Sequence, residues 1–254
     1  MKCRIQIYLI KNLIIRFIKN LINLKFLKKK KTFNQICYPK EFKLQPQQRF
    51  LGEYLNPKTP YKGLLVFHRI GAGKTCTAVR IAEAWKGDHN IIVVVPASLR
   101  GNFKSELRSL CAGSSYLKDN ERKKLEELHP STSEYKKIIK ESDNRIDKYY
   151  KIYSYNKFVE LVENNKMNLS KSILIIDEIQ NMVSEGGHYY NTLYNAIYSA
   201  PRTLRVVALT ATPMFDKPIE IALTMNLLKI PFQFPTGSAF QKMFIDVEKK
   251  RLKN

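Results

Sequence analysis

The chain has 254 residues, of which 44% are hydrophobic and 26% charged, a composition typical of a globular protein with a buried core. The formal net charge of +22 is unusual and indicates a polyanionic partner, nucleic acid before an anionic membrane. The four cysteines, Cys3, Cys37, Cys76 and Cys111, form no C-x-x-C pair, and the histidines show no ligand spacing. From the cysteines and histidines we therefore expect no metal site, no disulfide framework and a reducing compartment.

The first 39 residues form a basic extension. Residues 1–40 hold eleven Lys and Arg and no Asp or Glu, which is half of the net charge. Their apolar runs are interrupted by cations before reaching the roughly 18 residues that a spanning helix needs, so we expect no stable membrane insertion. The pattern predicts a basic helix ending at the Lys28–Lys31 run. Three interpretations of this segment stay open: it contacts a membrane surface, it contacts nucleic acid, or it is a poorly ordered extension.

From residue 40 onwards, apolar runs alternate with segments of helical length. The runs at 63–68, 91–96, 172–177 and 205–210 predict buried parallel strands, with a weaker candidate at 150–154. This alternation predicts an α/β fold, a parallel sheet with helices on both faces. A polar stretch at about 112–149 predicts a helical insertion on the surface.

The stretch GAGKT follows the first predicted strand and opens a helix, the context that a phosphate-binding loop requires. Its backbone N–H groups approach phosphate oxygens, and the helix N-terminus adds partial positive charge. Lys74 would contact the β- and γ-phosphates, and Thr75 would bind Mg²⁺. The predicted nucleotide-binding set is Gly71, Ala72, Gly73, Lys74, Thr75 and Cys76. A strict motif has a leading glycine where this chain has His68.

Two acids, Asp177 and Glu178, end the ILII strand, at the edge where α/β sheets bind ligands. Asp177 would hold Mg²⁺ through water, and Glu178 would position or deprotonate an attacking water. Thr210 and Thr212, in the strand-end stretch LTATPM, can hydrogen-bond toward the acids or the γ-phosphate. Upstream, the amide of Gln48 could read an adenine edge, because it both donates and accepts.

These stretches, in this order, resemble the first RecA-like domain of superfamily-two helicases and translocases over about residues 40–230. The resemblance is greatest to the Swi/Snf-like branch of large DNA viruses, which includes poxvirus nucleoside triphosphatase I and the early-transcription-factor ATPase. LQPQQ is similar to that branch's adenine motif, and GAGKT, VVVPASLRGNF, DEIQ and LTATPM are similar to motifs I, Ia, II and III. The resemblance implies a RecA-like fold, ATP and Mg²⁺ as ligands, and a role in viral transcription or nucleic-acid remodelling.

The resemblance also implies roles for further residues. Gln180 would link the γ-phosphate to motif III, and Thr210 and Thr212 would relay hydrolysis to a bound strand. The implied nucleic-acid contacts are Ser98, Leu99 and Arg100, with DNA favoured over RNA. Contacts there would be independent of base sequence and sensitive to salt. Relatives usually have glycine at Arg69, so this side chain would either clash with the turn or add a cation beside the phosphates.

Relatives hydrolyse ATP between two RecA-like domains, and the second domain supplies an arginine finger worth roughly 10³–10⁵ in rate. The sequence ends about forty residues after LTATPM, so we expect a second domain to come from a separate chain or a missing segment. A fragment, a split gene and a decaying copy all fit. A viral parent would imply the virion or the host cytoplasm.

We therefore expect the ATP-binding first domain of a nucleic-acid-dependent ATPase, covering residues 40–254, that turns over slowly by itself. Two alternatives stay open. One is a catalytically inactive nucleic-acid-binding remnant of such a helicase. The other is a small-molecule kinase with a P-loop, which accounts for GAGKT but not for DEIQ and LTATP.

Overall fold

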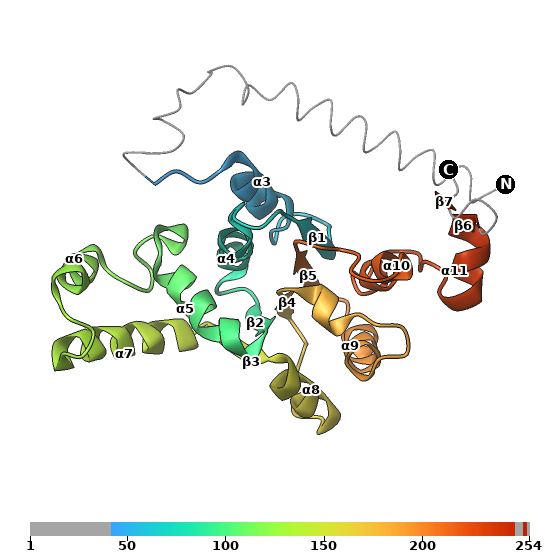
Figure 1. Cartoon of the computed structure of the whole chain (residues 1–254). Helices are drawn as coiled ribbons and strands as arrows, with labels where there is room; N and C mark the ends of the chain where they lie inside the picture. Colours follow the sequence, from blue (N-terminus) through green and yellow to red (C-terminus); the bar gives the residue numbers. More distant parts are fainter. Residues whose placement is uncertain (1–41, 247–250, 253–254) are drawn as a thin grey trace, which may run out of the picture. The chain divides into compact units, whose positions relative to one another are not determined.

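The computed structural model describes residues 42–246 and 251–252 (Figure 1). The chain divides into two compact units, Met1–Pro46 and Gln47–Asn254, and the sheet and its helices belong to the second. The basic extension predicted at residues 1–39 lies outside the described residues. No helix in the described part is long and apolar enough to cross a membrane.

A five-stranded parallel sheet forms the centre of the second unit. Its strands are β1 (Gly63–Phe67), β2 (Asn90–Val95), β3 (Tyr150–Ser154), β4 (Ser172–Ile176) and β5 (Arg205–Thr210). They pair in the order β1-β5-β4-β2-β3, and every pairing is parallel. All five predicted strands are present; β1, β2 and β4 each end one residue before the predicted boundary. The predicted α/β class is confirmed.

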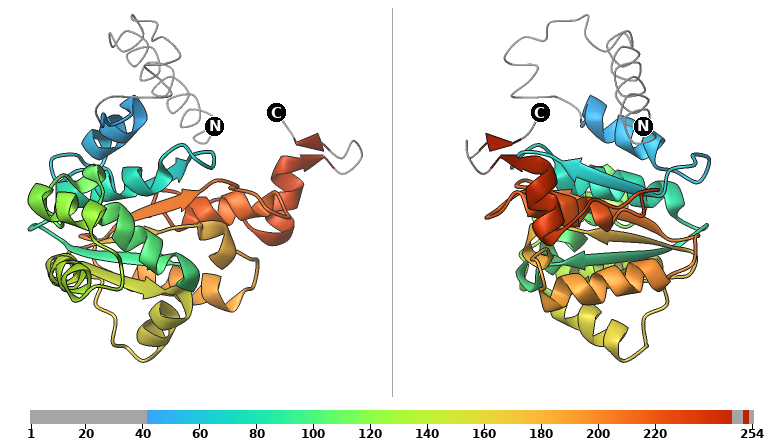
Figure 2. Two further views of the ribbon diagram at one scale, coloured as in Figure 1. Left: turned by 60° about the vertical axis from the view of Figure 1, so that its left-hand side comes forward. Right: turned by 90° about the vertical axis from the view of Figure 1, so that its right-hand side faces the viewer.

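Helices cover both faces of this sheet (Figures 1 and 2). One face carries α4 (Lys74–Trp85) and α5 (Arg100–Arg108), and the other carries α8 (Tyr155–Glu163), α9 (His188–Ser199) and α10 (Ile219–Asn226). The remaining helices are α3 (Pro46–Tyr54), α6 (Asp119–Glu127), α7 (Ser133–Asp147), α11 (Gly237–Phe244) and the 3₁₀ turns η2 (Ala97–Leu99), η3 (Leu110–Ala112) and η4 (Ile179–Met182). A short antiparallel pair, β6 (Ile245–Asp246) and β7 (Arg251–Leu252), follows α11.

The central strands are buried on both faces, which explains why they read as unbroken apolar runs. Side chains of neighbouring residues in a strand point to opposite faces. Leu174 and Ile176 of β4 belong to the apolar cluster formed with α8, α9 and α10. Ile173 and Ile175, equally buried, therefore face α4 and α5. Because all strands run in the same direction, the loops after β1, β2, β4 and β5 gather at one edge of the sheet.

A disulfide joins Cys76 in α4 to Cys111 in η3, so the expectation of no disulfide is wrong. The two cysteines are 35 residues apart in sequence, but α4 packs against η3 and brings their Cα atoms to 5.5 Å. Residue spacing alone does not reveal such a pair, because tertiary packing creates it. The expectation of a reducing compartment, which rested on free cysteines, loses its basis.

We predict that reducing this disulfide destabilises the protein. A cross-link that closes a loop of 35 residues restricts the unfolded chain and is worth about 3–4 kcal/mol. Urea unfolding of the oxidised wild type should therefore show a lower midpoint after a dithiol reductant is added. Cys76→Ser/Cys111→Ser is the matched control, and its midpoint should not respond to reductant. Equal midpoints for oxidised and reduced wild type would contradict the prediction.

Candidate functional site

The loop between β1 and α4 depends on two glycines. Gly71 and Gly73 have φ values of 80° and 74°, in the left-handed region that side chains disfavour. A Cβ at Gly73 would also lie 2.3 Å from Nε2 of Gln48. Arg69 does not have a positive φ, and its carbonyl accepts a hydrogen bond from the N–H of Ala72 at 3.1 Å. Of the two possibilities for Arg69, the clash with the turn is therefore absent, and its side chain is exposed.

Gln48 lies beside this loop rather than on the surface. Its side chain is 5% exposed, and its Nε2 donates to the carbonyl of Gly73 at 3.2 Å. The hydroxyl of Thr77 donates to the same carbonyl at 3.2 Å, a contact that the sequence pattern did not suggest. Both bonds hold the start of α4 in place. The predicted contact of Gln48 with adenine stays a prediction.

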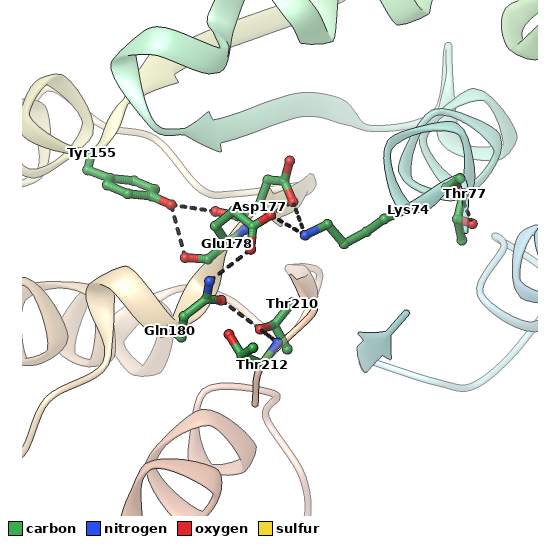
Figure 3. Close-up of polar contacts among 9 residues, drawn as sticks. Lys74, Thr77, Tyr155, Asp177, Glu178, Gln180, Thr210 and Thr212 are labelled. Carbon is green, nitrogen blue, oxygen red and sulfur yellow. Dashed lines mark hydrogen bonds and ion pairs between the residues drawn. The ribbon is translucent and has the colours of Figure 1, made fainter. Parts of the chain in front are cut away.

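Lys74, the first residue of α4, meets both acids that follow β4 (Figure 3). Its Nζ lies 3.5 Å from Oδ1 of Asp177 and forms an ion pair with Oε1 of Glu178. The strands that carry these residues are not neighbours, because β5 lies between β1 and β4. The lysine side chain therefore reaches across the end of β5. The structure brings together the three residues on which the predicted site depends.

The two acids have opposite pKa shifts. Burial raises the pKa of Asp177; the Lys74 ammonium opposes this rise, and the Glu178 carboxylate adds to it. Partial burial would also raise the pKa of Glu178, but hydrogen bonds from Lys74 and Gln180 outweigh it and hold this pKa below its ordinary value of 4.5. Glu178 is thus ionised at neutral pH and already paired with a cation.

A chain of hydrogen bonds connects Glu178 to the end of β5 (Figure 3). Nε2 of Gln180 donates to Oε2 of Glu178 at 2.8 Å, and the hydroxyl of Thr210 donates to Oε1 of Gln180 at 2.6 Å. The backbone N–H of Thr212 donates to the Thr210 hydroxyl at 2.9 Å. Thr212 thus takes part through its backbone, and its exposed side chain makes no hydrogen bond among the described residues. The predicted coupling residues therefore stand in one network with Glu178.

Tyr155, at the start of α8, is a site residue that the sequence analysis did not identify. Its hydroxyl donates to the carbonyl of Asp177 at 2.6 Å and lies 3.0 Å from the carbonyl of Glu178. Glu178 has a φ of 49°, unusual for a residue with a side chain. That backbone conformation brings the two carbonyl oxygens to one hydroxyl. No local sequence pattern connects Tyr155 to the acids, which lie more than twenty residues further along the chain.

The remaining predicted residues also lie at this edge of the sheet. Thr75 is half-buried in the first turn of α4. The side chain of Cys76 is taken up by the disulfide, so only its backbone could contact a ligand. Ser98 lies in η2, after β2, and Arg100 opens α5; both are exposed, whereas Leu99 between them is half-buried. Their predicted roles are not tested by these positions.

The opposed pKa shifts generate a prediction for the protein without ligands. Because the folded pKa of Glu178 lies below 4.5, its charge contributes stability that is present above this pH and is lost as the pH falls through the folded pKa. Lys74→Met removes the cation, so the pKa of Glu178 should rise and that contribution should disappear at a higher pH. Carbon-13 NMR titration of the carboxyl groups measures the shift. Lys104→Met, which disturbs only the pairs with Asp143 and Asp147, should leave Glu178 unchanged.

Comparison with known proteins places this geometry in a family. Residues 6–215 match the family model "Type III restriction enzyme, res subunit". The chain is 62% identical over 219 residues to "Putative ATP-dependent RNA helicase R563" of Acanthamoeba polyphaga mimivirus, covering 86% of this chain and 38% of that protein. It is 27% identical over 173 residues to a "Termination factor NPH-I homolog" of African swine fever virus, covering 66% of this chain and 22% of that protein.

Among solved structures, the chain is similar to the SWI2/SNF2 ATPase core of Sulfolobus solfataricus in complex with dsDNA. The TM-score is 0.50 at 17% identity, over 80% of this chain and 39% of that one. This likeness shows the fold, which is RecA-like as expected. The chain thus spans well under half of the relatives that it matches. The chain belongs to the helicase-like family of the type III restriction enzyme Res subunit, as the first RecA-like domain of a superfamily-two helicase or ATPase.

Proposed function

We propose that this domain binds ATP together with Mg²⁺ at the carboxyl edge of its sheet and hydrolyses it in a nucleic-acid-dependent manner when a second RecA-like domain closes on the site. The observation that carries the proposal is the convergence of Lys74 with Asp177 and Glu178. A cation at a helix N-terminus beside two carboxylates suits a magnesium-bound triphosphate, because each charged group finds an opposite charge.

The residues of the loop fit these ligands. Gly71 has no heavy atom within 4 Å of the place that a Cβ would take, so a phosphate can approach the backbone there. The hydroxyl of Thr75 and the carboxylate of Asp177 offer the oxygen ligands that Mg²⁺ prefers. When bound, the ion would neutralise charge that develops on the phosphate oxygens.

In the reaction, each side chain does one task. The Lys74 ammonium would exchange its carboxylate partners for phosphate oxygens. Glu178, ionised because its pKa is low, would accept a hydrogen bond from the attacking water and orient it. Gln180 and Thr210 would transmit a displacement of Glu178 to the end of β5, since their hydrogen bonds connect Glu178 to that strand.

Two features support a second domain as the completing part. Among the described residues, no arginine pairs with Asp177 or Glu178. An arginine supplied in trans is worth roughly 10³–10⁵ in rate for nucleoside triphosphatases. The mimivirus relative is more than twice as long as the stretch that this chain covers. The rest of such a chain therefore has room for a second RecA-like domain.

Nucleic acid is the proposed polymer, and DNA is favoured over RNA. The net charge of +22 supplies the non-specific attraction to phosphates. The exposed side chains of Ser98 and Arg100 lie at the same edge as the nucleotide site. The Sulfolobus protein with the same fold was solved with dsDNA, which supports DNA for this chain as well.

We predict that ATP binding depends on Lys74. Isothermal calorimetry with ATP and Mg²⁺ should detect binding by the wild type, and Lys74→Ala should weaken it by about tenfold or more, because a charge-assisted contact contributes roughly 1.5–3 kcal/mol. Lys104→Ala, which removes an equal charge from α5, is the matched control and should bind normally. Equal affinities of Lys74→Ala and wild type would contradict the proposed site.

We also predict that Arg100 contacts the phosphate backbone. Arg100→Ala should weaken DNA binding by a similar factor for every sequence and reduce the slope of log K against log salt by about one. Fluorescence anisotropy across a salt series measures both quantities. Lys124→Ala removes a cation that already pairs with Glu134, and it should alter neither value. A specific loss for one DNA sequence would speak against a backbone contact.

A further inference from the structure

Tyr155 connects a distant part of the sheet to the two acids. It is the first residue of α8 and directly follows β3, one of the two edge strands of the sheet. The acids follow β4, and β2 lies between β3 and β4. Its ring therefore reaches across the carboxyl end of β2 to bring its hydroxyl to the backbone of Asp177 and Glu178 (Figure 3).

The contact is to the backbone, at a residue whose backbone conformation is disfavoured. Glu178 has φ 49° and ψ 51°, a left-handed conformation that side chains disfavour. The carbonyl oxygens on either side of this turn both lie within 3.0 Å of the Tyr155 hydroxyl. Asp177 contributes a second restraint, because its Oδ1 accepts the N–H of Glu178 at 3.0 Å.

The same turn decides where the Glu178 carboxylate points. One of its oxygens pairs with Lys74 and the other accepts from Gln180. Without the left-handed turn, the side chain of Glu178 would leave the direction of Lys74.

We propose that Tyr155 is a positioning residue: its hydroxyl holds the turn at Asp177 and Glu178 and thereby aims the Glu178 carboxylate at the reaction centre. The consequence for hydrolysis rests on the proposed ATPase function, whereas the effect on Glu178 itself does not. The competing explanation is packing alone, because the ring also lies against the apolar cluster beneath α8. Removing the oxygen while keeping the ring separates the two.

The test uses the full chain with three readouts. In Tyr155→Phe, the NMR signals of the Gln180 side-chain amide should shift, because the displaced Glu178 carboxylate no longer accepts its hydrogen bond. Calorimetric affinity for ATP with Mg²⁺ should stay within about twofold, since Tyr155 touches neither Lys74 nor the glycine loop, and its bond to Asp177 is to the backbone carbonyl rather than the carboxylate. Single-turnover release of phosphate should slow by about tenfold or more, the order expected when a catalytic group is displaced slightly.

Tyr153→Phe is the matched control, because Tyr153 lies two residues earlier and its hydroxyl bonds to neither acid in the described structure. It should leave all three readouts unchanged. Tyr155→4-aminophenylalanine is a second variant that keeps a hydrogen-bond donor at the same place on the ring, and it should restore the wild-type Gln180 signals. It also decides the question if Tyr155→Phe lacks a cooperative melting transition: displaced Gln180 signals in this folded variant overturn the proposal.

The outcomes separate the two proposals. If wild type and Glu178→Gln release phosphate equally when DNA and a second RecA-like domain are supplied, the ATPase function fails, and the Gln180 signals still judge Tyr155. If Glu178→Gln abolishes release but Tyr155→Phe changes neither the rate nor the Gln180 signals, Tyr155 serves packing only. Loss of rate together with shifted Gln180 signals and an unchanged ATP affinity supports the positioning role.

Discussion

The site depends on one ammonium group shared by two carboxylates. Lys74 and Glu178 are 104 residues apart in sequence, and the ion pair forms only because both lie at the carboxyl edge of the same parallel sheet. Two neighbouring carboxylates repel each other, and burial opposes the charge on Asp177. The cation of Lys74 offsets both effects. Such a balance is easily redistributed by a ligand that brings its own positive and negative charges, which is what a magnesium-bound nucleotide does.

The elements around this cation act mainly by restricting its neighbours. Gln48 and Thr77 hold the Gly73 carbonyl, so α4 begins at a defined place. The disulfide attaches the first turn of α4 to η3, just beyond the end of α5. On the other side, Tyr155 restrains the turn that carries Glu178. The lysine and its acids are thus supported by contacts from α3, η3 and α8.

The strand order places the end of β5 between the loop that carries Lys74 and the acids that follow β4. Because it separates β1 from β4, its end lies directly beneath the lysine and beside Gln180. Thr210 is fully buried there and donates to Gln180, while the exposed segment after it, with Met214 and Phe215, leads out to the surface. A change at Glu178 can therefore pass through two hydrogen bonds to a surface segment.

The sequence by itself determined the α/β class, five strands with their boundaries to within one residue, and the loop and acids of the site. These features are encoded locally, since an apolar run, a glycine that adopts positive φ or a carboxylate after a strand is visible in a few adjacent letters. Only the tertiary structure decided the strand order, the disulfide between Cys76 and Cys111, the burial of Gln48 and the bond from Tyr155 to the acids. Each of these joins residues that are far apart in the chain, and packing of the whole domain, rather than any local pattern, brings them into contact.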